Sequence, residues 1–172
     1  MNQSTILRYK DESDKSYGVV GMALSAFVLD FDRYLSSVNI DSDDMDCVQF
    51  IPEYYFSGNP SVSARVAWNL LVERFQNISG LLLGNVLCRL SVVDKQLSKA
   101  HYDSILMTLE EAGKDMCQLE KEEIVSIINK EYQQLHRIFG NKEVNSLVEE
   151  LHQKLVEKRC LCRNEIMEFL NS

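Results

Sequence analysis

The sequence has few of the residues that interrupt a long helix. Of its 172 residues only two are proline, Pro52 and Pro60, and only seven are glycine. Proline breaks a helix interior because it lacks a backbone N–H group and clashes with the preceding turn. Alternation of apolar and polar residues, which is typical of half-buried strands, is also missing. These absences favour an all-α fold.

Clustered positive charge is the second absence. The formal net charge is -8, and the longest basic run is the pair Lys158-Arg159. Proteins that bind phosphate backbones or anionic membranes need grouped lysine and arginine side chains. We therefore expect neither a nucleic acid nor a membrane among the partners.

A secretory leader and paired cysteines are missing as well. The first apolar stretch, residues 19–29, follows the acidic residues Asp11, Glu12 and Asp14, whereas a secretory signal begins with basic residues. The five cysteines are odd in number, and Cys88 lies in an apolar stretch where a thiol behaves as a small apolar side chain. Both features suit a reducing compartment, so we expect a cytoplasmic protein.

The stretch from Asn59 to Leu97 predicts a long central helix. Asn59 and Pro60 are typical of a helix start, because asparagine caps free N–H groups and proline fits the first turn. Residues 78–93 are apolar on nearly all sides, but the run is shorter than the roughly 20 residues of a membrane span and contains Arg89. One apolar row recurs every three or four residues: Ala67, Leu71, Phe75, Ile78, Leu82, Val86, Leu90, Val93 and Leu97.

Small residues within this helix predict a close helix–helix contact. Gly80, Gly84 and Cys88 follow one another at intervals of four and would let another backbone approach. Each glycine also weakens a helix by about 1 kcal/mol. Whether the helix is continuous or broken near Asn77–Gly80 stays open.

The rest of the chain predicts a single-domain bundle of five or six helices over residues 16–172, preceded by a flexible polar arm over residues 1–15. The loops between the helices are expected to be short, except for residues 39–58, so neighbouring helices should pack antiparallel. The acidic loop 39–46 lacks the glycine and glutamate of a calcium-binding loop and is interpreted as a solvated turn. The other helices are expected at 16–38, 98–113, 115–139, 141–159 and around Ile166, Phe169 and Leu170.

No residue pattern indicates catalysis, a metal or a cofactor. Cys160 and Cys162 have no second cysteine pair, which a structural zinc site would require. Glu149 and His152 have the Glu-x-x-His spacing of di-iron bundles, but the matching position before His136 holds Gln133. We interpret these residues as parts of solvated helix faces.

The strongest candidate for a binding surface is the aromatic loop that leads into the central helix. The candidate residues are Tyr54, Tyr55, Phe56, Arg65 and Trp68. They could bind an anion, because a helix start offers free N–H groups. The interpretation that we favour is that the aromatic side chains seal the end of the bundle.

Two functions follow as hypotheses. The first is a non-catalytic protein-interaction or regulatory module. The alternative is a small-molecule or anion-binding module, or an enzyme, that uses residues 54–68. A pocket at these residues would favour the alternative, and a flat apolar patch the first. We also expect a homodimer, formed partly through the short C-terminal helix.

Overall fold

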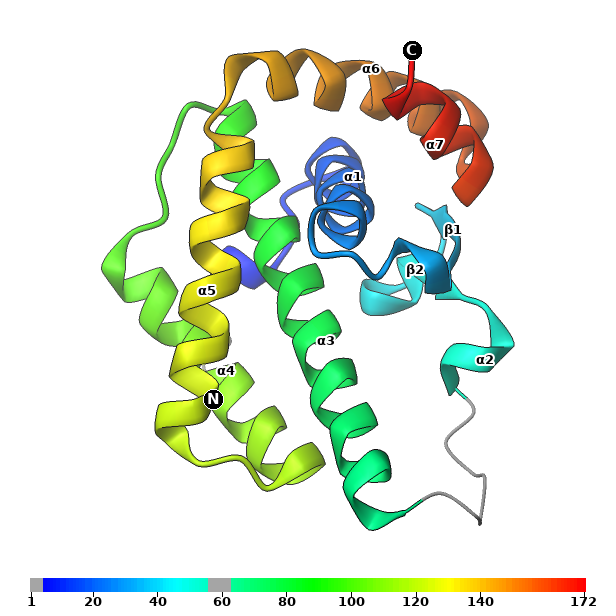
Figure 1. Ribbon diagram of the computed structural model, residues 1–172. Coiled ribbons are helices and arrows are strands. Elements are labelled where there is room, and N and C mark those ends of the chain that lie inside the picture. The colour runs from blue at the N-terminus through cyan, green and yellow to red at the C-terminus, as the bar shows by residue number, and fades with distance from the viewer. Residues whose placement is uncertain (1–4, 56–62) are drawn as a thin grey trace.

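The computed structural model describes residues 5–55 and 63–172. In these residues the protein is mostly helical, as predicted, with an added three-stranded sheet (Figure 1). The helices are α1 (Glu12–Val28), α2 (Pro52–Tyr55), α3 (Ala64–Val92), α4 (Lys99–Cys117), α5 (Lys121–Phe139), α6 (Lys142–Lys158) and α7 (Arg163–Leu170). The strands are β1 (Leu35–Asn39), β2 (Val48–Phe50) and β3 (Cys160–Cys162), and short 3-10 turns lie at Thr5–Leu7, Asp32–Tyr34 and Asp44–Cys47.

Helix α3 is the central element. It packs against α1, α4, α5 and α6 and is the longest helix in the described part of the chain (Figure 1). It runs without interruption through residues 77–80, which answers the open question of a break. Its start is Ala64, where Ser63 accepts a hydrogen bond from the Val66 backbone, rather than Pro60. The predicted cap Asn59 and Pro60 lie outside the described residues, and the helix ends before the predicted Leu97.

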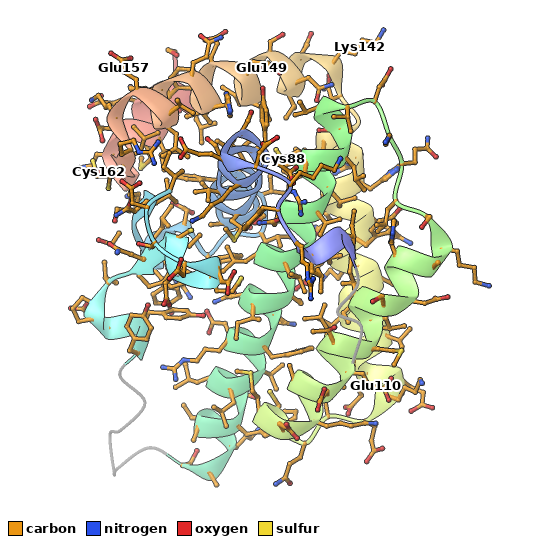
Figure 2. The ribbon with its side chains drawn as sticks, turned by 180° about the vertical axis from the view of Figure 1, so that it is seen from behind. Cys88, Glu110, Lys142, Glu149, Glu157 and Cys162 are labelled. Carbon is orange, nitrogen blue, oxygen red and sulfur yellow. The ribbon has the colours of Figure 1, made fainter. Side chains whose placement is uncertain are left out.

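The small-residue row of α3 makes the closest helix contact, as the sequence predicts. Gly84 faces Gly21 of α1, and a Cβ atom placed on Gly21 would lie 2.3 Å from the Gly84 carbonyl oxygen. The reverse distance, from a Cβ atom on Gly84 to the Gly21 carbonyl oxygen, is 2.7 Å. Neither position therefore has room for a side chain. Cys88 lies beside α1 in the interior, one turn further along α3 (Figure 2).

Arg89 fixes the N-terminal segment to this helix pair. Its side chain is 7% exposed and forms an ion pair with Asp14 of α1, with 2.6 Å between Nη2 and Oδ2. All five of its N–H groups have partners: both Asp14 carboxylate oxygens, the carbonyl oxygens of Ile6 and Arg8, and Asn85 Oδ1. Residues 5–15 thus lie against the bundle, which differs from the loose arm expected over residues 1–15.

The first helix ends earlier than the predicted range 16–38. In the structure α1 ends at Val28, and Asp30 then adopts a left-handed conformation with a φ of 61°. The buried residues Leu35 and Val38 follow Phe31 at helical spacing in the sequence but belong to β1, the middle strand of the order β2-β1-β3. An irregular register between Leu35 and Ser37 places two buried residues three positions apart, so the alternation typical of a strand is absent from the sequence.

The boundary between α4 and α5 also differs from the prediction. Helix α4 continues through Gly113 to Cys117, and Gln118 makes the turn in a left-handed conformation. Gly113 is an interior packing residue, since a Cβ atom there would lie 2.8 Å from Ile124 Cδ1. Helix α5 begins at Lys121 rather than at Asp115, after a capping box formed by Glu120 and Glu123.

The C-terminal segment packs against β1 and the turn at Asp32–Tyr34. β3 pairs with β1, and Arg163 of α7 binds Asp32, with 2.7 Å between Nη2 and Oδ2. Ile166 is 1% exposed, while Phe169 and Leu170 pack half-buried on the core. The apolar side chains of α7 are therefore largely covered within one chain, which leaves the predicted homodimer without a large apolar surface on this helix.

Candidate functional site

The predicted binding residues fall on two elements. Tyr54 and Tyr55 form the end of α2, and Arg65 and Trp68 lie in the first two turns of α3. Phe56, the fifth candidate, lies outside the described residues. The rings of Tyr54 and Tyr55 contact each other, whereas Trp68 contacts the end of α4.

Tyr54 is a packing residue between α2 and α3. Its ring stacks on Phe50 with 4.1 Å between ring centroids, and the Arg74 guanidinium lies 5.6 Å from its centroid. Burial raises the pKa of Tyr54 above its ordinary value. The space beside its ring is only about 40 Å³ and has neither Arg65 nor Trp68 among its lining residues. This space has room for little more than water.

Trp68 contacts the end of α4. Its Nε1–H group donates to the Cys117 carbonyl oxygen at 2.9 Å, which satisfies a carbonyl at the helix terminus. The side chain is nevertheless 44% exposed. Trp68 is thus held by one polar contact while much of its ring faces solvent.

The first two turns of α3 are exposed on all sides. Every residue from Ala64 to Leu70 is exposed, and the first buried side chain of the helix is Phe75. We call this segment, Ala64–Leu70, the α3 start. Three of its large apolar side chains, and Tyr55 nearby in the chain, expose a large fraction of their surface: Val66 48%, Trp68 44%, Leu70 38% and Tyr55 61%.

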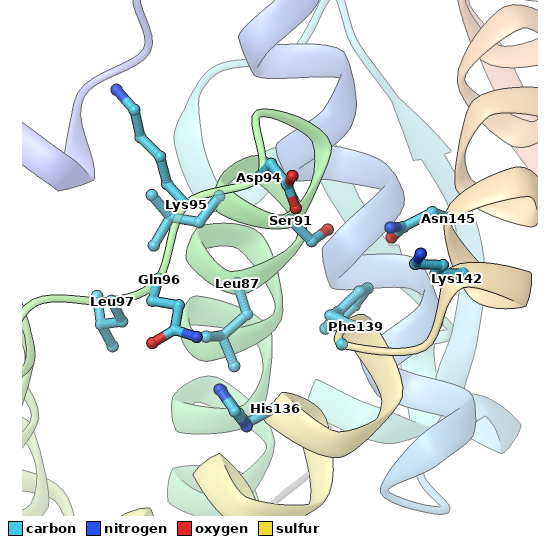
Figure 3. Close-up of a pocket in the computed structure, with 12 residues that line it drawn as sticks. Leu87, Ser91, Asp94, Lys95, Gln96, Leu97, His136, Phe139, Lys142 and Asn145 are labelled. Carbon is cyan, nitrogen blue, oxygen red and sulfur yellow. The ribbon is translucent and has the colours of Figure 1, made fainter.

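A pocket of about 390 Å³ lies at the opposite end of α3 (Figure 3). Ser91, His136, Lys142 and Asn145 surround it, from α3, α5 and α6, and the segment Asp94–Leu97 forms one side. The Ser91 hydroxyl donates to the Cys88 carbonyl of its own helix. Among the described contacts His136 has no hydrogen bond to this serine.

Glu149 and His152 serve the contact between α6 and α1. The Tyr17 ring stacks on the His152 ring at 3.8 Å between centroids, and the Tyr17 hydroxyl donates to Glu149 Oε2 at 2.8 Å. Burial is the main reason why the pKa of Tyr17 rises to about 12. In residues 5–55 and 63–172 no group of three or more His, Cys, Asp or Glu side chains is placed to hold a metal ion.

One buried titratable residue is absent from the candidates that the sequence suggests. Glu131 on α5 is 7% exposed, and its carboxyl group contacts the Ser79 hydroxyl of α3. That hydroxyl also lies 3.0 Å from the Gln76 carbonyl oxygen, to which it can donate its single hydrogen. Both contacts are satisfied at once when Glu131 is protonated and donates to Ser79. Burial raises the pKa of Glu131 to about 8, against the opposing effects of the Ser79 hydrogen bond and Lys130.

The raised pKa predicts how stability changes with pH. Because the carboxyl group ionises near its ordinary value of 4.5 in the unfolded chain and near 8 in the folded one, the unfolded state binds fewer protons between these values. The free energy of unfolding should fall with rising pH there, by up to about 1.4 kcal/mol per pH unit from this group. The free energy of unfolding of Glu131→Gln, measured with urea, should not show this fall with rising pH. Equal slopes for the native protein and the variant would show that Glu131 titrates normally.

Comparison of the chain with protein-family models, with curated proteins and with solved structures finds no match. Among the helices that the structure describes, none combines the length and the apolar character needed to cross a membrane.

Proposed function

We propose that the protein is a non-catalytic protein-interaction module and that the α3 start is its binding surface. The observation that carries the proposal is the exposure of Val66, Trp68 and Leu70 at the start of a helix whose later turns lie in the core. Val66 and Leu70 are four residues apart and share one face of the helix, whereas Trp68 lies on the other side. Exposed apolar residues that form one patch are typical of interaction sites.

The composition of this surface supports the same function. Arg65 carries the only charge in the α3 start, and Trp68 adds large aromatic area. Tryptophan, tyrosine and arginine are the residues most enriched where partners contribute binding energy. Depletion of charge is typical of the centre of an interface. The partner is therefore expected to offer an apolar groove with an acidic rim that faces Arg65.

Crosslinking in the native host tests the proposal. A photoreactive phenylalanine derivative in place of Val66 or Leu70 should give one discrete protein adduct, because these positions lie within the proposed interface. The matched control is Met107 on α4, which is 72% exposed and lies outside the α3 start. Adducts that are absent at Val66, or equally abundant at Met107, would contradict the proposal.

The mass of the adduct separates the kinds of partner. An adduct of twice the chain mass would identify the partner as a second copy, in line with the predicted homodimer but through α3 rather than α7. A heavier or lighter adduct would identify a different protein. The alternative function, a small-molecule or anion-binding module at residues 54–68, would give no protein adduct and would show as ligand-induced shifts at Arg65 and Trp68.

A reducing compartment is part of the proposal. The free thiols of Cys47, Cys88 and Cys117 are buried, and those of Cys160 and Cys162 are exposed but unpaired. Burial raises the pKa of the Cys47 and Cys117 thiols, which keeps them protonated and unreactive. These properties support a cytoplasmic location.

A further inference from the structure

A polar pocket lies between α3, α5 and the turn that follows α1. Its volume is about 450 Å³, comparable to the smaller ligand pockets of proteins. Asp30, Glu73 and Glu131 contribute carboxyl groups, and Asn77 and Gln76 contribute amides. Val28 and Ile127 add apolar surface to the walls. The pocket is separate from the α3 start and is not needed for the function proposed above.

Glu131 occupies a position where the fold needs an apolar residue. Its neighbours along the buried face of α5 are Ile124, Ile128 and Leu135, all fully buried. A leucine at position 131 would continue this row. Buried carboxylates are normally paired with a cation, because removing an ion from water is costly. Among the described ion pairs none includes Glu131, and its one side-chain partner is the neutral Ser79.

Asn77 is a second polar group with unused bonding capacity in the same wall. Its side chain is 5% exposed, and Nδ2 lies near the Tyr54 side chain but forms no hydrogen bond of normal geometry in the described part of the chain. Most buried amide groups are hydrogen-bonded. A pocket that holds both an uncompensated carboxyl group and an unpartnered amide has the polar groups of a binding site.

The charges around the pocket select the sign of the ligand. Glu73 is half-buried and already binds Arg33 at 2.9 Å, whereas Asp30 stands exposed at the mouth. Lys130 is the only basic residue in the lining and lies exposed at the rim. Because Arg33 offsets Glu73 and Lys130 offsets Asp30, the charge that Glu131 carries when ionised is the one in this lining without a described counter-ion, and that charge selects a cation. A metal ion does not fit, because the described residues hold no group of three ligands.

We propose that this pocket binds a small organic cation, an alkylammonium compound, whose ammonium group forms an ion pair with Glu131. The alkyl chain lies against Val28 and Ile127, and a second ammonium group, where the ligand has one, reaches Asp30. Binding converts the protonated carboxyl group of Glu131 into a carboxylate, and the displaced proton leaves to solvent. The Ser79 hydroxyl then turns from the Gln76 carbonyl toward the new carboxylate, which keeps that side chain hydrogen-bonded.

Titration calorimetry of the full-length protein with 1,4-diaminobutane and n-butylamine tests the proposal. At pH 7, in phosphate and in HEPES, each bound amine should release about one proton, because Glu131 is mostly protonated there. At pH 9 the proton release should fall, and the affinity should be about tenfold higher, since alkylammonium groups stay charged while Glu131 is already ionised. n-Butanol, which lacks the charge, should not bind.

Three variants make the test specific. Glu131→Gln keeps the size and the contact with Ser79 but should lose both amine binding and proton release. Glu122→Gln, an exposed position on the same helix outside this pocket, should bind like the native protein. Asp30→Asn, which suits the left-handed backbone of that residue, should weaken 1,4-diaminobutane several-fold and leave n-butylamine unchanged.

The proposal is overturned by any of three results. These are no amine binding at millimolar concentration, equal binding by native protein and Glu131→Gln, or binding without buffer-dependent heat at pH 7. Far-ultraviolet circular dichroism of each variant verifies that it is folded, so a loss of binding by Glu131→Gln counts only with a native spectrum. If that variant is unfolded, the missing buffer-dependent heat in the native protein remains a decisive test.

Discussion

Replacing Arg89 with methionine should lower the free energy of unfolding by about 3–5 kcal/mol, the range found when one partner of a buried ion pair is removed. Methionine fills much of the space of the arginine stem, so the loss of volume is small. The change removes the Arg89 donor from the carbonyl groups of Ile6 and Arg8 and from the Asp14 carboxylate, which keeps the hydrogen bond from the Lys10 backbone. Urea unfolding followed by circular dichroism measures the loss. We also expect faster amide exchange in residues 5–11, since Arg89 holds this segment on the bundle.

A surface arginine provides the matched control. Arg33 binds Glu73 at 2.9 Å, but the Arg33 side chain is 64% exposed, so Arg33→Met should change stability little. A comparable loss in both variants would mean that Arg89 does not act as a buried anchor.

Lowering the pH should reproduce part of the loss of stability that is expected for Arg89→Met. Burial alone would raise the pKa of Asp14, but hydrogen bonds from Arg89 and from the Lys10 backbone outweigh burial and hold the pKa below its ordinary value. A lowered pKa gives stability that is present above the unfolded pKa, about 3.9, and is lost as the pH falls through the folded value. The acid-induced loss of stability should therefore be smaller in Asp14→Asn than in the native protein.

The second large effect is expected at the crossing of α1 and α3. Gly21→Ala should lower the free energy of unfolding by roughly 2–3 kcal/mol, as overpacking does in a tight core. The added Cβ atom would lie 2.3 Å from the Gly84 carbonyl oxygen and 2.4 Å from Cys88 Cβ, so the two helices must move apart. This penalty acts against the gain of about 1 kcal/mol that alanine brings within a helix.

Gly80→Ala is the control for that substitution. Gly80 lies on the same row of α3, but its added Cβ atom would meet Leu29 Cδ1, the mobile end of a side chain, at 2.5 Å. The helix-propensity gain should offset this contact, and Gly80→Ala should be nearly neutral by thermal unfolding. If Gly21→Ala were equally neutral, the close approach of α1 and α3 would be disproved.

The sequence carries enough information for the central packing of the fold. Residues that repeat every three or four positions identify α3, and the small row at Gly80 and Gly84 predicts its tight contact, because both signals lie within one helix. The sheet is not predictable in the same way. β2 and β3 are three residues each, and the irregular register in β1 removes the two-residue period, so a helical row continues through Leu35 and Val38 by coincidence.

The candidate sites show the same limit. Composition singles out Tyr54 and Trp68 because both are aromatic and close in the chain. Tyr54 packs on Phe50, four residues earlier, but Trp68 bonds to Cys117, which is 49 residues further along and is brought to it only by the tertiary fold. Glu131 had a usable signal: it is an acidic residue in line with Ile128 and Leu135, on the row that faces the core. A charged residue in an otherwise apolar helix row indicates one of two situations. Either it pairs with a polar or oppositely charged group on the facing helix, or it lies in the interior without such a partner.

Hydrogen exchange along α3 tests the central claim most directly. The claim is that one continuous helix is mostly buried between Phe75 and Arg89 and exposed at the α3 start, where we propose that a partner binds. In the purified protein, amides of residues 66–70 should exchange much faster than those of residues 80–89, and adding the crosslinked partner should slow only the first group. Equal slow exchange along the whole helix in the free protein would contradict the account, because the α3 start would then already be covered.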